Sequence, residues 1–226
     1  MLRTAGGFSR RLNSVQATHR VAGFDARLHR AATYYDQRSL PLLFRVTPLC
    51  IAADPLLEAR GFTREAPTDV MVAELIDPQG GDGVVVATEP NPAWLEAQEK
   101  WLGITSSEAW EATLDRSVDG PATTGFGLVL EEGAPVAAGL AVADAGWVGL
   151  FEITVDPEHR QRGLGRTMIR GLLRWGSRAG ARRSYLQVLE QSSAARNMYN
   201  SLGFTVSYSY WYRRAPIAGL QACNGK

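Results

Sequence analysis

Apolar positions recur with a helical period in the C-terminal third of the chain. Five of them follow one another at spacings of three or four between positions 163 and 179: Leu164, Met168, Leu172, Trp175 and Ala179. This spacing places them on one face of an α-helix. Gly180 stands where such a helix ends. We therefore predict a long amphipathic helix over residues 163–179.

Short apolar runs predict strands on both sides of this helix. The three runs before it, 125–130, 135–143 and 147–155, are separated by compact Gly-containing turn sequences and predict an antiparallel meander. After it we expect a strand over 183–190, a short helix over 193–202 and a strand over 204–213. Upstream, the pattern predicts a strand over 84–88 and helices over 92–101 and 106–116. These elements predict an α/β (α+β) fold.

The chain carries an internal echo. Gly61-Phe62-Thr63 and Gly203-Phe204-Thr205 lie 142 residues apart. At the same offset a strand-like run, 42–47, matches 184–189, and a helix-like run, 25–38, falls near the long C-terminal helix. We predict that residues 1–76 repeat the helix–strand–helix–strand order of residues 163–213. No counterpart of the glycine motif described below is expected in this first copy.

Composition narrows the class of protein. With 226 residues, 45% hydrophobic and 21% charged, the chain is an ordinary globular protein of one large domain or one and a half small ones. The net charge of +1 favours neither nucleic acid nor membrane as a partner. Two cysteines, Cys50 and Cys223, and three scattered histidines exclude a disulfide framework and a zinc motif, so no metal is expected.

The N-terminal segment has two interpretations. Residues 1–24 carry four arginines, and no acid precedes Asp25, which fits either a transit peptide or a basic first strand. The segment has no secretory apolar core, and the longest apolar stretch, 134–143, is too short to span a bilayer. We therefore expect a cytoplasmic protein.

The segment before the long helix is the strongest chemical signal. A strand ends at Val155, and Gly163-Leu164-Gly165 opens the helix. The first turn of a helix has unpaired N–H groups and a partial positive charge. Glycines allow a phosphate to approach the backbone, so the pattern indicates a pyrophosphate cradle. Three arginines add positive charge there: Arg160, Arg162 and Arg166.

A dinucleotide-binding motif is the competing interpretation of this segment. The spacing is not Gly-x-Gly-x-x-Gly, because position 168 is Met. The segment follows a meander rather than opening a βαβ unit, and Glu190 stands too late for the ribose contact. A mononucleotide- or dinucleotide-binding protein is therefore disfavoured.

Two motifs resemble one known family. Val155-x-Pro157-x-x-Arg160-x-x-Gly163-x-Gly165 is similar to the acyl-CoA signature of the GNAT superfamily of N-acetyltransferases. Ala195-x-x-Met198-Tyr199-x-x-x-Gly203-Phe204 resembles its second motif. The resemblance covers residues 68–213, and the order of elements agrees with it. It implies a GNAT fold with a mixed, mostly antiparallel sheet flanked by helices.

The start of the chain resembles part of the same family. Residues 6–15 are similar to a strand in the degenerate first half of tandem GNAT proteins. We therefore favour a strand over a transit peptide there. The resemblance implies a degenerate GNAT-like half repeat over 1–67, an acetyltransferase domain over 68–215 and a tail over 216–226.

The resemblance implies where acetyl-CoA binds. The donor would lie between the strands 147–155 and 183–189, with its pantetheine arm paired to the backbone of Ile153, Thr154 and Val155. A backbone N–H near these residues would stabilise the oxyanion. The backbone N–H groups that would hold the pyrophosphate are those of Gln161, Arg162, Gly163, Leu164, Gly165 and Arg166. Ser192 stands where the family has a CoA-contacting Asn, so that contact would be only partly replaced.

The resemblance also implies how the reaction proceeds. An amine would attack the thioester directly, and Tyr199 matches the family tyrosine that gives a proton to the leaving thiolate. The alternative for Tyr199 is an aromatic residue packed on the sheet. Glu152 is the only carboxylate inside the fourth strand and is the candidate general base, with an arginine partner or a water chain as alternatives.

The expected function is an acetyl-CoA-dependent N-acetyltransferase acting on a primary amine that the sequence does not identify. A non-catalytic acyl-CoA-binding sensor or partner module is the alternative. The aromatic run Tyr208, Tyr210, Trp211 and Tyr212 fits an acceptor pocket, a homodimer face or a strand packed on the core. The arginines along the long helix fit a solvated face or an anionic partner.

Overall fold

The computed structural model describes residues 1–4, 9–16, 23–76, 78–103 and 122–216. It contains two compact units. Unit 1 comprises residues 1–69, 189–191 and 208–226, and unit 2 comprises residues 70–188 and 192–207. The strands β3 (Thr63–Glu74) and β9 (Thr205–Arg214) each contribute to both units. The division into a half repeat over 1–67, an acetyltransferase domain over 68–215 and a tail over 216–226 stays a prediction.

Unit 2 is built on a mixed sheet, as the sequence predicts. The strands β5 (Thr123–Glu131), β6 (Ala134–Asp144) and β7 (Trp147–Val155) form the antiparallel meander. At one edge β4 (Val84–Ala87) pairs antiparallel with β5. On the other side β8 (Arg183–Leu189) runs parallel to β7, and the end of β3 follows, so the order is β3-β8-β7-β6-β5-β4.

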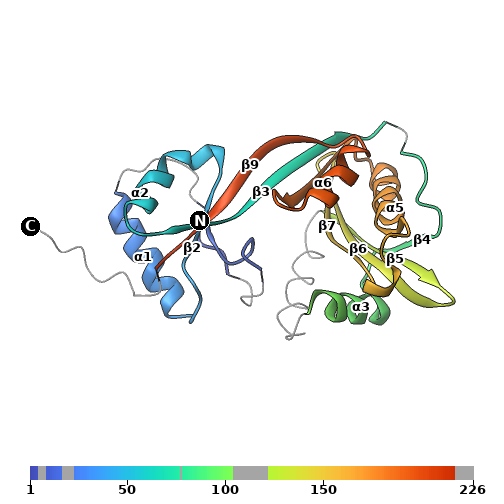
Figure 1. Cartoon of the computed structure of the whole chain (residues 1–226), viewed down its shortest axis with the longest axis horizontal. Helices are drawn as coiled ribbons and strands as arrows, with labels where there is room; N and C mark the ends of the chain where they lie inside the picture. The colour runs from blue at the N-terminus through green and yellow to red at the C-terminus, as the bar shows by residue number, and fades with distance from the viewer. Residues whose placement is uncertain (5–8, 17–22, 77, 104–121, 217–226) are drawn as a thin grey trace, which may run out of the picture. The chain divides into compact units, whose positions relative to one another are not determined.

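Helices cover both faces of this sheet (Figure 1). The long helix α5 (Leu164–Arg178) confirms the predicted amphipathic helix, and its Met168 and Leu172 are fully buried on one face. On the other face α3 (Pro92–Leu102) buries Trp94. The short helices η2 (Pro157–His159) and α6 (Ser193–Asn200) complete the unit. The helix expected over 106–116 lies outside the described residues.

The close approach of α5 to the sheet depends on glycine in the strands. A Cβ at Gly139 of β6 would lie 2.8 Å from Ile153 Cδ1 and 3.0 Å from Leu172 Cδ1. A larger residue there would therefore push Leu172 and the middle of α5 away from the sheet. The glycine of β6 thus allows α5 to pack closely on the sheet.

Unit 1 is smaller and has the element order predicted from the echo. It contains β1 (Val15–Gln16), α1 (Phe24–Asp36), β2 (Leu43–Val46), η1 (Pro48–Ala53), α2 (Asp54–Glu58) and the adjoining parts of β3 and β9. Its strand order is β1-β2-β9-β3. The order helix–strand–helix–strand is present, while the duplication itself stays a prediction.

The strand expected over residues 6–15 is wrong over most of its described length. Ser9 to Asn13 form a turn in which the Asn13 N–H donates to the Ser9 carbonyl at 3.0 Å. The strand begins only at Val15, where β1 pairs parallel with Phe44 of β2. Consecutive turn hydrogen bonds satisfy the backbone before it reaches the sheet edge.

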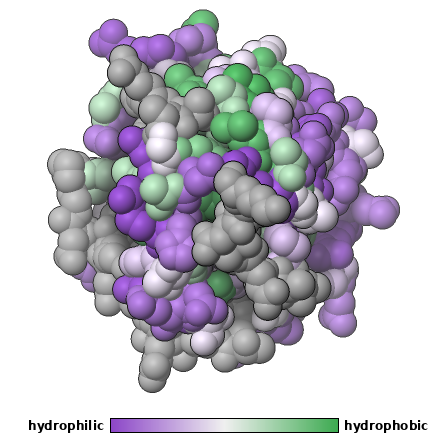
Figure 2. Space-filling view, turned by 90° about the vertical axis from the view of Figure 1, so that its left-hand side faces the viewer, coloured by the Kyte–Doolittle hydropathy of each residue, from purple (hydrophilic) through white to green (hydrophobic). Residues whose placement is uncertain are grey.

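The core of unit 1 lies between its sheet and its helices. Tyr35 and Leu57 are fully buried there. Figure 2 looks onto the side that lies at the left of Figure 1, and shows apolar side chains gathered in the upper half of this face with polar ones around them. Leu49 and Ile51 of η1 are exposed apolar residues of this unit. Among the helices of the described residues, none combines the length and apolarity needed to cross a bilayer.

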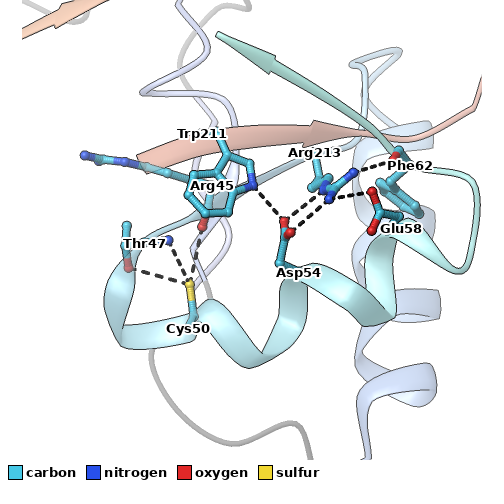
Figure 3. A network of polar contacts seen from close by, with 8 residues as sticks. All are labelled: Arg45, Thr47, Cys50, Asp54, Glu58, Phe62, Trp211 and Arg213. Atoms are coloured by element: carbon cyan, nitrogen blue, oxygen red, sulfur yellow. Dashed lines mark hydrogen bonds and ion pairs between the residues drawn. The ribbon is translucent and has the colours of Figure 1, made fainter. Parts of the chain in front are cut away.

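A buried ion pair crosses this core (Figure 3). Arg213 of β9 is 5% exposed and donates to both carboxylate oxygens of Asp54, at 2.8 and 2.9 Å. Arg213 also donates to Glu58 at 3.1 Å, and Trp211 Nε1 donates to Asp54 at 2.7 Å. The Arg213 hydrogen bonds lower the pKa of the Asp54 carboxyl. The pair therefore ties α2 to β9.

Candidate functional site

The strands β7 and β8 pair along only part of their length. Parallel pairing joins residues 147–150 to residues 183–186 and ends at Leu150 and Leu186. The rest of β7, residues 151–155, therefore has one backbone edge without a strand partner in the described part of the chain. Such an edge presents N–H and C=O groups to an extended ligand.

A bulge in β7 starts where this pairing ends. Leu140 of β6 pairs with Phe151, but Ala138 pairs with Thr154, so one extra residue stands in β7. Glu152 at this point has a φ of 48°, in the left-handed region that non-glycine residues rarely adopt. Bulges turn a strand and re-aim its groups. The bulge therefore changes the direction of the free edge over residues 152–155.

Gln98 of α3 holds the bulge in place. Its side chain is fully buried, its Nε2 donates to the Glu152 carbonyl at 2.7 Å, and its Oε1 accepts from Thr154 Oγ1 at 3.1 Å. Gln98 is a site residue that was not predicted from the sequence. Its signal was a polar residue on the apolar face formed by Trp94, Ala97 and Trp101, which are four, one and three positions away.

The start of α5 presents unpaired backbone donors. Gly163 is the N-cap with a φ of 81°, and the first N–H that donates to it is that of Thr167, at 3.0 Å. The N–H groups of Leu164, Gly165 and Arg166 come before that bond and have no intrahelical acceptor. A Cβ at Gly163 would meet nothing within 4 Å, so the space beside it is open. The first turn contains no acidic residue.

The loop between β7 and α5 is anchored at both of its ends. The Asp156 N–H donates to the Val136 carbonyl at 3.0 Å. Arg162 donates to both carboxylate oxygens of Glu131, at 3.0 and 2.9 Å, so its guanidinium braces the loop. The side chains of Arg160 and Gln161 are exposed. The loop is thus fixed while its backbone remains accessible.

Tyr199 lies in the same hydrophobic cluster as the residues predicted around the donor. Ile153, Val155, Leu164 and Tyr199 all pack against the main core of unit 2. The Tyr199 ring also makes an edge contact with Phe204 at 6.1 Å between centroids. Burial raises the pKa of the Tyr199 hydroxyl, which keeps it protonated. A protonated phenol is a suitable donor to a thiolate.

Two further candidate residues have defined places. The backbone of Glu152 forms the bulge, and its side chain is half-buried. Ser192 precedes α6, where its carbonyl accepts from the Arg196 N–H at 3.0 Å. Within the described residues no group of three or more potential ligands could hold a metal ion. A free strand edge followed by open helix N–H groups fits an extended ligand that ends in a diphosphate.

Comparisons with known proteins point to one family. Residues 1–213 match the family model described as "Probable histone acetyltransferase Rv0428c C-terminal". The chain is 30% identical over 127 residues to the "Uncharacterized N-acetyltransferase YobR" of Bacillus subtilis, which is 55% of this chain and 50% of that protein. It is 35% identical over 65 residues to the "[Ribosomal protein bS18]-alanine N-acetyltransferase" of Escherichia coli K12, 27% of this chain and 44% of that protein. The matches thus span about half the length of these curated relatives.

Solved structures share the fold. A GCN5-related N-acetyltransferase from Sphaerobacter thermophilus has a TM-score of 0.66 at 21% identity, covering 89% of this chain and 71% of that chain. One from Kribbella flavida has a TM-score of 0.64 at 17% identity, covering 94% and 84%. A tandem GNAT protein from the clavulanic acid biosynthesis pathway has a TM-score of 0.64 at 15% identity, covering 91% and 76%.

Proposed function

The chain belongs to the family described as "Probable histone acetyltransferase Rv0428c C-terminal", a family of GNAT acetyltransferases. From this membership we propose that the chain transfers an acetyl group from acetyl-CoA to a primary amine. One observation carries the proposal most directly. The free edge of β7 leads to the open N-terminus of α5, where Gly163 leaves space beside unpaired N–H groups. This arrangement suits a pantetheine arm followed by a pyrophosphate.

The donor would be held mainly by backbone groups. We assign the pantetheine contacts to Ile153, Thr154 and Val155, and the pyrophosphate contacts to the N–H groups of residues 161–166. Ser192, before α6, would contribute a hydroxyl. When bound, acetyl-CoA supplies a thioester whose carbonyl carbon is open to attack by an amine. A backbone N–H at the β7 bulge is the oxyanion donor in this assignment.

Proton transfer is assigned to two side chains. Tyr199 would protonate the leaving thiolate, and the raised pKa of its hydroxyl means that it holds its proton until the thiolate forms. Glu152 is the proposed base that removes a proton from the ammonium form of the acceptor. A water chain reaching the same point is the alternative to Glu152.

The acceptor is proposed only as a primary amine. One relative is named for the alanine of a ribosomal protein, and the family description names histone. Both names favour a protein amine in the first panel of acceptors to be tested. The alternative function is a non-catalytic module that binds acyl-CoA as a sensor or partner, which would keep the cradle but not the proton transfer.

The test is calorimetric titration of acetyl-CoA into the full chain and into Gly163→Asp. The substitution places a negative charge beside the unpaired N–H groups, so binding should be lost. Gly180→Asp is the matched control, because Gly180 has a φ of 90° and open space but lies after the other end of α5. Absence of binding to the unsubstituted chain, or equal loss in both variants, would refute the donor site.

A second measurement separates the enzyme from the binding module. Release of free CoA is followed with small amines, amino acids, a peptide with N-terminal alanine and a lysine-containing peptide. Release that depends on one of these amines supports the transferase. Tight acetyl-CoA binding without release for any amine supports the non-catalytic module.

A further inference from the structure

Unit 1 contains two buried arginines that differ in one respect. Arg213, 5% exposed, is neutralised by Asp54 and Glu58. Arg45, 8% exposed, has no carboxylate within 4 Å among the residues that the structure describes. Removing a charge from water without a counter-ion is costly, so buried arginines are normally paired. Arg45 is therefore a buried cation without a protein counter-ion in the described part of the chain.

The side chain of Arg45 is held in one plane. Arg45 lies on β2 opposite Tyr212 of β9, and its guanidinium stacks over the Tyr210 ring at 3.9 Å from the centroid. Its Nε is buried and has no hydrogen-bond partner in the described part of the chain. Figure 3 shows the guanidinium directed away from the Asp54–Arg213 pair. The two buried arginines of unit 1 thus differ in their partners: Arg213 is paired with carboxylates, and Arg45 is stacked on a tyrosine ring.

A second polar group without a partner belongs to the adjoining strand segment. Ser14 is 1% exposed, and its buried Oγ makes no hydrogen bond within the described residues. It precedes β1, whose Gln16 pairs with Arg45. A hydroxyl and a guanidinium that both lack partners are complementary to the oxygen atoms of an anion.

The segments of unit 1 outside the described residues do not supply that anion. Residues 5–8, 17–22 and 217–226, which lie outside the described part, contain no Asp or Glu. The unit as a whole has 13 Lys and Arg residues against 7 Asp and Glu residues, a net charge of +6, although the full chain has only +1. The chain is nearly neutral as a whole, but its unit 1 is strongly basic and therefore attracts anions.

We propose that Arg45 anchors a binding site in unit 1 for an oxyanion, a carboxylate or phosphate group carried by a small ligand. The stacked guanidinium is pre-oriented, and its Nε–H together with a neighbouring Nη–H forms the two-pronged donor that such groups bind. The site is separate from the cradle at α5, and the inference does not depend on the proposed acetyl transfer.

The experiment uses the full chain, Arg45→Met and the matched control Arg38→Met. Arg38 is also stacked on a tyrosine, Tyr34 at 3.7 Å, but is exposed, so its replacement removes the same charge and a similar contact. The thermal midpoint Tm of each protein is measured in sodium phosphate and in sodium chloride of equal ionic strength. A parallel series with succinate distinguishes a carboxylate ligand from a phosphate ligand.

The site predicts that phosphate or succinate raises the Tm of the unsubstituted chain by about 2–4 °C once the ion is several-fold above its Kd. Arg38→Met should keep this rise and Arg45→Met should lose it. Any phosphate held at α5 contributes equally to the three proteins, so their difference reports Arg45. Arg45→Met should fold, because an apolar side chain of similar length replaces an unpaired buried charge. Equal shifts in all three proteins, or no shift in the unsubstituted chain, would overturn the proposal.

A second variant is used if Arg45→Met does not fold. Arg45→Lys keeps the charge but not the two-pronged donor, so it should bind the anion at least tenfold more weakly. Equal affinity of Arg45→Lys and the unsubstituted chain would overturn the proposal.

Discussion

The short helix α2 of unit 1 and the short helix α6 of unit 2 end in the same way. Each belongs to a segment with the same order of elements, which is α1–β2–α2–β3 for α2 and α5–β8–α6–β9 for α6. The Phe62 N–H donates to the Leu57 carbonyl at 3.1 Å, and the Phe204 N–H donates to the Tyr199 carbonyl at 3.1 Å. One residue earlier, Gly61 donates to Glu58 at 2.9 Å and Gly203 donates to Asn200 at 3.0 Å. The backbone closes both helices alike, yet the side chains at equivalent positions differ. Leu57, fully buried, stands where unit 2 has Tyr199.

The two long helices also begin alike. Gly23 and Gly163 are both N-caps in the left-handed region, with φ of 64° and 81°. Two positions later unit 1 has Asp25, bonded to Arg60 at 3.0 Å, while unit 2 has Gly165. A carboxylate in the first turn occupies the positive end of the helix and repels another anion. The two segments thus share these backbone features and differ in side chains at two positions, where unit 2 has Tyr199 and Gly165 and unit 1 has Leu57 and Asp25.

The sequence before these glycines is also related. Four residues of the glycine motif region recur 140 positions earlier in the chain. They are Val155, His159, Arg160 and Gly163, and their counterparts are Val15, His19, Arg20 and Gly23. This spacing repeats only part of the glycine motif, so the expected absence of a full counterpart in the first copy stays a prediction. Unit 1 lacks two residues of the motif, because Ala17 stands at the position of Pro157 and Asp25 at the position of Gly165.

The largest expected effect comes from giving unit 2 the residue of unit 1. Tyr199→Leu and Tyr199→Phe both remove the proposed acid, and kcat should fall by about 10²–10⁴-fold. The Kd for acetyl-CoA, measured by calorimetry, should change little in Tyr199→Phe because the ring remains. Unchanged kcat in Tyr199→Phe would assign Tyr199 to packing alone.

The second effect concerns what holds each unit together. The pKa of Asp54 is lowered in the folded state from 3.8, so its stabilisation is complete above that pH and is lost as the pH falls through the lowered value. We expect unit 1 to lose hydrogen-exchange protection below about pH 4, before unit 2 does.

Asp54→Asn tests this at neutral pH. It leaves Arg213 buried with only Glu58, so unfolding of unit 1 should become easier by about 3 kcal/mol. Asp25→Asn is the matched control, since the Asp25 side chain is 77% exposed and its pairing contributes little. Equal protection of unit 1 in the two variants would contradict the assigned role of the buried pair.

The sequence predicted the elements better than the contacts between them. Periodicity was sufficient for α5 and the meander, because an apolar stripe and Gly-containing turns are local signals. The bulge at Glu152 and its support by Gln98 were missed, because they depend on which helix packs on which strand. For the same reason Arg162 was predicted as a charge for phosphate, while its partner Glu131 is 31 residues away in sequence.

The third effect comes from giving the first turn of α5 the acidic residue found in the first turn of α1. Gly165→Asp copies the position of Asp25 into α5, and the Kd for acetyl-CoA should rise about 100-fold, since a carboxylate near 4 Å from a phosphate repels it by a few kcal/mol. A Cβ at Gly165 has only ordinary contacts, 3.7 Å to Met198 and Val155, so folding should be kept. Gly165→Asn is the isosteric control. Equal weakening by Asn and Asp would show a steric effect rather than an electrostatic one.

The smallest expected effect concerns the bulge of β7 that Gln98 braces. Gln98→Glu keeps the shape of the side chain but replaces the N–H that donates to the Glu152 carbonyl at 2.7 Å. A carboxylate facing a carbonyl leaves that acceptor unsatisfied, so kcat should fall about 10-fold at neutral pH. When the pH falls and the introduced carboxyl is protonated, it can donate again and part of the activity should return.

This recovery separates a positioning role from a merely structural one. A residue needed only for folding would give the same fractional activity at every pH at which the protein is folded. Thr154→Val is the matched comparison, because it removes the hydrogen bond to Gln98 Oε1 but leaves the donor to Glu152. We expect Thr154→Val to have a smaller effect and no recovery at low pH. A flat pH profile for Gln98→Glu relative to the unsubstituted chain would show that the bulge keeps its geometry without Gln98.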